Sequence, residues 1–142
     1  MFRREYKLEG KESAEMKDLP PFVQGYIEAA FFMGEETEEY NISEMSFHDI
    51  PRDELVKIIE DCQKFYSENE GLLSKLSEAD PEYGDMEAGR DLYYTRNGHG
   101  VGFWDRGFKG EYAEIAEELS DKASAMGTSE LSLADDGSLF TM

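Results

Sequence analysis

The densest group of chemically capable side chains lies between Arg90 and Lys109. This segment holds Trp104, the single Trp of the chain, and His99, one of its two His. Four of the 14 Lys and Arg residues also fall here, so the segment is slightly positive in a chain of formal net charge -19. A His beside carboxylates can act as a general acid or base, or can bind a metal. The segment is therefore the first place to look for a site.

A catalytic interpretation combines four residues of this segment into a small hydrolytic or nucleotide-processing site. The four are Asp91, Arg96, His99 and Asp105. Their spacing matches no metal-binding signature, so we expect neither a metal nor a cofactor. The simpler interpretation is a hairpin in which Asn97 and the neighbouring glycines satisfy the turn geometry. Arg96 and Arg106 would then pair with local carboxylates, and we favour this interpretation over the enzyme.

Acidic residues are concentrated outside this segment. Residues 28–87 carry eighteen Asp and Glu against four Lys and Arg, and residues 110–142 carry eight against one. Such a field repels nucleic acid and anionic bilayers but attracts basic surfaces, including the DNA-binding faces of proteins. The charge therefore argues against direct nucleic-acid binding, and the alternative use of the acidic surface is to keep the protein soluble.

These observations predict a partner protein with a basic surface. Carboxylates of the acidic stretches would steer its approach, and Arg and Trp side chains of the central segment would give specific contacts. The residues predicted to bind it are Glu35, Glu36, Glu38, Glu39, Asp53, Glu54, Glu60, Asp61, Arg96, Trp104 and Arg106.

Apolar residues at three- and four-residue spacing predict three helices. The first follows Pro20-Pro21 and runs over 22–31, the second covers 55–76, and the third covers 111–126. The second can break near residues 69–71, where Asn and Gly interrupt its pattern.

Two hairpins complete the predicted fold. Residues 92–96 and 101–105 are rich in β-favouring types and flank Asn97-Gly98, a strong turn signal. Residues 131–133 and 139–141 alternate between apolar and polar side chains and flank the turn Asp135-Asp136-Gly137. The sequence therefore predicts an α+β fold, in which an antiparallel sheet of about four strands is covered by about three helices.

Residues 95–107 read TRNGHGVGFWDRG, and this motif resembles one in a family of small proteins from tailed-phage genomes and prophages. The resemblance extends to residues 21–30, to Asp61-Cys62 with Phe65, and to the turn at 135–137, so it covers about residues 20–140. It implies a phage-encoded protein that acts in the cytoplasm of the bacterial host, and it implies no particular activity.

Residues 1–19 have few apolar side chains and read as a flexible arm, followed by a single domain over 20–142. Cys62 is the single Cys, so an intramolecular disulfide is excluded and a reducing compartment fits. No apolar run approaches the length needed to span a bilayer.

The leading functional hypothesis is a non-enzymatic phage protein that binds and modulates a host DNA-handling or defence protein, with mimicry of DNA charge as one means. The alternatives are the small enzyme described above and a homo-oligomer with a structural role.

Overall fold

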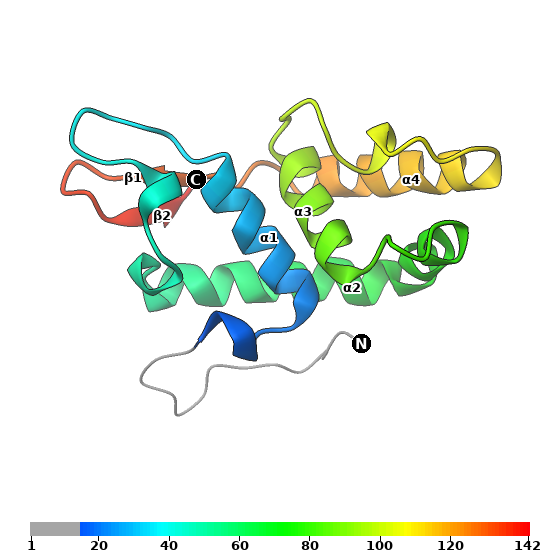
Figure 1. Ribbon diagram of the computed structural model, residues 1–142, viewed down its shortest axis with the longest axis horizontal. Coiled ribbons are helices and arrows are strands. Elements are labelled where there is room, and N and C mark those ends of the chain that lie inside the picture. Colours follow the sequence, from blue (N-terminus) through cyan, green and yellow to red (C-terminus); the bar gives the residue numbers. More distant parts are fainter. Residues whose placement is uncertain (1–14) are drawn as a thin grey trace.

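The computed structural model describes residues 15–142, which form a mainly helical protein with one short sheet (Figure 1). The helices are α1 (Pro21–Phe32), α2 (Arg52–Ala79), α3 (Asp85–Arg96) and α4 (Glu111–Ala125). The strands β1 (Leu131–Leu133) and β2 (Leu139–Thr141) form an antiparallel pair, and single 3-10 turns cover Met16–Asp18 (η1), Ile42–Glu44 (η2), Phe47–Asp49 (η3) and Phe103–Asp105 (η4).

The predicted four-stranded sheet is wrong. Residues 92–96 are the last turns of α3, and residues 101–105 contain the η4 turn instead of a strand. The helix forms because Glu87 accepts a hydrogen bond from the Gly84 N–H at its start, and because buried Ala88 and Leu92 share one face. The β-favouring types at residues 93–95 are overridden by packing, since Tyr93 is buried against Tyr26 of α1.

The three helices expected from periodicity are confirmed as α1, α2 and α4. The second helix could be continuous or break near residues 69–71, and α2 is one long helix in which Asn69 has non-helical angles (φ -126°, ψ 15°) and marks a kink. The C-terminal hairpin is also confirmed, with Leu131 opposite Thr141 and Leu133 opposite Leu139.

α1 and α3 lie side by side across the long α2 (Figure 1). Their backbones touch at two glycines. A Cβ on Gly89 would lie 1.9 Å from the Phe22 carbonyl oxygen, and one on Gly25 would lie 2.0 Å from that of Met86. Any larger side chain at either position would force the two helices apart.

The core is one continuous cluster between this helix pair, α2, α4 and the hairpin. Phe65 of α2 lies at its centre and stacks on Phe22 and on Phe103, with ring centroids 6.3 and 5.9 Å apart. Of the predicted arm, residues 1–14 lie outside the described residues, while Met16–Asp18 form η1 and Leu19 is buried in the core.

Candidate functional site

Arg96 is a buried connector and not a surface contact. Its side chain is 4% exposed, and its Nη1 atom donates to Asp61 Oδ2 at 2.9 Å and to the Tyr26 hydroxyl at 3.3 Å. Its Nε atom donates to the Gly127 carbonyl oxygen at 2.9 Å. One guanidinium thus ties the end of α3 to α1, to α2 and to the residues that follow α4, which leaves it unavailable to a partner protein.

Asp91 and Arg106 form a second internal pair. The Asp91 carboxylate, 2% exposed, accepts from Arg106 Nη2 at 2.9 Å, from Arg106 Nε at 3.0 Å and from the Tyr83 hydroxyl at 2.7 Å. Burial raises the pKa of Asp91, and the hydrogen bonds from Arg106 and Tyr83 oppose that rise without cancelling it. The Arg106 guanidinium also lies over the Tyr83 ring, 5.3 Å from its centroid.

His99 belongs to neither pair. Its ring stacks on Tyr93, with centroids 5.8 Å apart, and its Nε2 atom lies 2.5 Å from Glu130 Oε1. That distance permits an ion pair, although the direction is unsuitable for a hydrogen bond. Asp105 accepts from the Gly102 N–H at 2.9 Å.

No hydrogen bond or ion pair joins any two of the four residues of the catalytic interpretation, although the charge of Asp105 contributes to the raised pKa of Asp91. Hydrogen-bonded proximity between a base and its partners, which acid–base catalysis requires, is not found among them. Residues 15–142 also contain no group of three or more His, Cys, Asp or Glu placed to hold a metal ion.

Trp104 is presented outward by a loop that is fixed on both sides. Phe103 before it is fully buried, and Arg106 after it is tied to Asp91. Gly102 has φ 150°, and a Cβ there would lie 2.0 Å from Thr95 Oγ1, so the loop packs closely on α3. Trp104 itself is 55% exposed, which suits an interface residue because Trp is enriched among binding hot spots.

A first acidic surface gathers residues far apart in the sequence. Glu35 accepts from the Leu133 N–H at 2.7 Å, and the Tyr40 hydroxyl donates to the Asp136 carbonyl oxygen at 3.4 Å. The acidic loop 35–39 and the hairpin turn therefore lie side by side around a depression of about 340 Å³. We call the set Glu35, Glu36, Glu38, Glu39, Asp135 and Asp136 the hairpin-end acidic surface.

A second acidic surface lies on α4. Four exposed carboxylates recur at intervals of three, four and three residues, which places them on one face of the helix. We call Glu111, Glu114, Glu118 and Asp121 the α4 acidic row. Among residues 15–142, no ion pair involves any of them.

Sequence reasoning missed the α4 acidic row and both Asp of the hairpin turn. The signal for the row was present, because its spacing is helical and the helix itself was predicted. The proximity of the turn to residues 35–39 had no such signal, since it depends on contacts across almost one hundred residues.

The other four acidic residues predicted to bind a partner divide into two that are exposed and two that make contacts within the protein. Asp53 and Glu60 are exposed on α2, whereas Asp61 is held by Arg96. Glu54 is mostly buried and accepts from the Thr141 N–H at 3.0 Å and from its hydroxyl at 2.6 Å. Its partial burial acts to raise its pKa, but the hydrogen bonds from Thr141 and Lys57 hold the pKa below its usual value. Glu54 thus fastens β2 to α2.

Comparisons of the chain with protein-family models, with curated proteins and with solved structures find no match. In the part of the chain that the structure describes, each helix is too short or too polar to cross a lipid bilayer.

Proposed function

We propose that this protein binds a host protein through that protein's basic surface and modulates it, in part by presenting carboxylates where DNA would present phosphates. The observation that carries the proposal is the existence of two surfaces of exposed carboxylates, the hairpin-end acidic surface and the α4 acidic row. The loop and hairpin lie at one end of the molecule, and α4 begins at the other (Figure 1).

The spacing of the charges supports this function. From Glu111 to Asp121 the α4 acidic row covers ten residue steps, about 15 Å at the rise of an α-helix. Charges at that density attract Lys and Arg over a range set by the Debye length, about 8 Å at physiological ionic strength. The main effect is faster association with a basic partner and rejection of nucleic acid and other acidic partners.

The proposed setting is a phage-encoded protein in the cytoplasm of a bacterial host, and the partner is a DNA-handling or defence protein. Its support is the resemblance of residues 95–107 to a phage and prophage motif. Arg96, Phe103 and Arg106 of that motif make internal contacts, so a family sharing the motif would share an architecture. Such a family can keep this framework while its surface charges adapt to different partners.

The test is capture of partners from a bacterial lysate by the tagged protein, at about 50 mM and about 150 mM salt. A first variant replaces the α4 acidic row (Glu111→Gln, Glu114→Gln, Glu118→Gln and Asp121→Asn). A second neutralises the hairpin end (Glu36→Gln, Glu38→Gln, Glu39→Gln and Asp135→Asn) and spares Glu35 and Asp136, which make hydrogen bonds to the hairpin backbone.

The matched control neutralises four exposed carboxylates outside both surfaces (Glu44→Gln, Glu68→Gln, Glu78→Gln and Glu82→Gln). It changes the net charge by the same amount as either variant. We expect the partner to be retained by the control and lost from at least one of the two variants, and a duplex of about 20 base pairs should displace it from the wild-type protein. Equal capture by all four proteins, or a partner that duplex DNA fails to displace, would contradict the proposal.

A further inference from the structure

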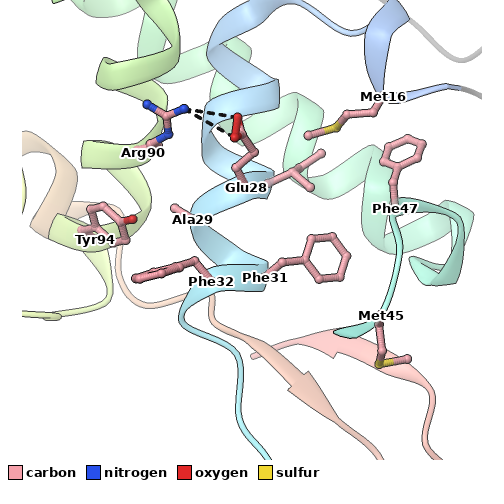
Figure 2. Close-up of a pocket in the computed structure, with 10 residues that line it drawn as sticks. Met16, Glu28, Ala29, Phe31, Phe32, Met45, Phe47, Arg90 and Tyr94 are labelled. Atoms are coloured by element: carbon pink, nitrogen blue, oxygen red, sulfur yellow. Dashed lines mark hydrogen bonds and ion pairs between the residues drawn. The ribbon is translucent and has the colours of Figure 1, made fainter. Parts of the chain in front are cut away.

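An apolar groove follows the second half of α1. It has a volume of about 480 Å³ and is lined on one side by Tyr94 of α3 and on the other by Met45 and Phe47. Phe31 and Phe32 project from α1 toward these two sides (Figure 2). The volume falls in the range of binding pockets, and the lining of aromatic rings and flexible Met side chains is typical of surfaces that accept apolar side chains.

Phe32 is the most unusual residue of this groove. Its side chain is 74% exposed, although it ends a helix whose opposite face is fully buried. Together with the half-buried Phe31, Met45, Phe47 and Tyr94 it forms a contiguous apolar surface around one groove. A contiguous apolar patch of this kind on a soluble protein marks an interaction site more often than a scattered exposed side chain does.

The charges at the groove define what can enter it. Arg90 lies 3.3 Å from Glu28 (Figure 2) and 3.4 Å from Glu87, so the guanidinium in the lining is matched by two carboxylates. An apolar segment with acidic flanks would be repelled by these carboxylates. A segment with basic flanks would gain both from burial of its apolar side chains and from attraction to the carboxylates.

We infer that this groove binds an amphipathic segment of the partner protein, whose apolar side chains are flanked by Lys and Arg. The inference rests on the proposed function, because a partner with a basic surface supplies such flanks. Apolar residues at positions i, i+3, i+4 and i+7 of a helix would enter the groove, with Phe32 as the residue that contributes most to binding. The acidic surfaces would then set the rate of encounter, and the groove would set the lifetime of the complex.

The test uses three labelled 14-residue model peptides and fluorescence anisotropy at about 150 mM salt. The first carries Leu at the four helical positions and Lys elsewhere, the second replaces Lys by Glu, and the third replaces Leu by Ser. We expect the Leu–Lys peptide to bind at least tenfold more tightly than either of the others. Phe32→Ser should weaken its binding at least tenfold, because the apolar anchor is lost.

Met142→Ser is the matched control, since it removes an exposed apolar side chain that does not line the groove. Both variants change exposed side chains, and circular dichroism verifies that the helices are intact. The inference is overturned if Phe32→Ser binds the Leu–Lys peptide as tightly as the wild type does, if Met142→Ser weakens this binding as much as Phe32→Ser, or if the Ser–Lys peptide binds as tightly as the Leu–Lys peptide. It is also overturned if light scattering shows a dimer that Phe32→Ser dissociates, because a second copy of the chain would then occupy the groove.

These outcomes separate the groove from the proposed function. A partner that is captured from lysate in a salt-dependent manner, and is retained by Phe32→Ser, leaves the proposed function intact and removes the groove from it. Selective binding of the Leu–Lys peptide without capture of any partner contradicts the proposed function and leaves the groove as a site for basic amphipathic segments.

Discussion

Two neighbouring stretches of this chain use charge in opposite ways. In residues 90–107, both Arg96 and Arg106 are paired with carboxylates, and the two carboxylates come from α2 and from α3. In α4, directly after that stretch, the four carboxylates of the acidic row face solvent without an ion pair in the described structure. The charges that look most like a site therefore hold the fold, while those that look like ordinary surface remain available to a partner.

The difference has an energetic basis. A guanidinium inside a protein is tolerated only where several acceptors replace its water, so every group around Arg96 depends on it. A surface carboxylate remains hydrated and contributes little to stability, so it can contribute to partner binding without a structural role. Substitutions in the first stretch should therefore act on stability, and those in α4 should act on binding alone.

Arg96→Met should have the largest effect. It removes the donor to Tyr26, Asp61 and Gly127 and leaves those acceptors with fewer hydrogen bonds. We expect a loss of about 3 kcal/mol in the free energy of unfolding, measured by urea denaturation. Asp61→Asn is the control, and it should cost about 1 kcal/mol because Asp61 is 40% exposed and water can replace much of the interaction. Equal stability of Arg96→Met and the wild type would mean that the buried charge is not a structural element.

Gly102→Ala should have the second-largest effect on the free energy of unfolding. Its φ of 150° disfavours a side chain, and the new Cβ would lie 2.0 Å from Thr95 Oγ1, so the loop that carries Trp104 would be displaced from α3. We expect a loss of about 2 kcal/mol. Gly98→Ala is the matched control, since its φ of 69° is also positive but nothing lies within 4 Å of the added Cβ. It should cost about 1 kcal/mol from backbone strain alone. If the two variants are equally stable, close packing of the loop on α3 is not what holds it.

The third expected effect, on the pH dependence of the free energy of unfolding, is smaller. Because the pKa of Asp91 is raised in the folded protein, the folded state binds more protons than the unfolded state between the two pKa values. Asp91 therefore contributes stability that is fully present below the unfolded pKa and is lost as the pH rises through the folded one. Urea denaturation between pH 3.5 and about 7 should show a weaker fall of stability with rising pH in Asp91→Asn than in the wild type.

Glu54 provides the opposite case within the same experiment. Its pKa is lowered in the folded protein, so its contribution is present above the unfolded pKa and is lost as the pH falls through the folded value. Glu54→Gln should therefore reduce the loss of stability at the acid end, where Asp91→Asn has no such effect. A pair of variants with the same pH dependence would show that the two carboxylates do not differ as their contacts indicate.

The same comparison explains what could be predicted from the sequence. α1, α2, α4 and the C-terminal hairpin follow from local periodicity and turn residues, and these were predicted correctly. α3 was missed because Tyr93, Tyr94 and Thr95 favour strands, while the contacts that make the segment helical come from α1 and depend on Gly25 and Gly89. Asn97-Gly98 was predicted as the turn between two strands, and it instead follows the end of α3, where Gly98 terminates the helix with φ 69°.

The partners of the buried charges could not be predicted for a related reason. Pairing of Arg96 and Arg106 with carboxylates was expected as local pairing, but Arg96 meets Asp61, which lies 35 residues away. Glu54 was expected at the surface, and it instead binds Thr141, 87 residues away. Sequence spacing reports which face of a helix a residue occupies, and it does not report which distant segment covers that face.

The smallest effect on stability, and the sharpest test of the comparison, is expected from neutralising the α4 acidic row. Glu111 and Glu114 lie in the first turn of α4, where their negative charges stabilise the helix by interacting with its dipole. Neutralising them removes this stabilisation but also lessens charge repulsion in a chain of net charge -19. The two terms oppose each other, so the free energy of unfolding should change by less than about 0.5 kcal/mol. Capture of the partner should nevertheless fall. Asp61→Asn, which removes a half-exposed carboxylate charge that is paired with Arg96, should instead change stability and leave capture per folded molecule unaltered. If neutralising the row unfolds the protein, or if Asp61→Asn lowers capture as much as the row does, then the division between charges that hold the fold and charges that bind is not the one the structure indicates.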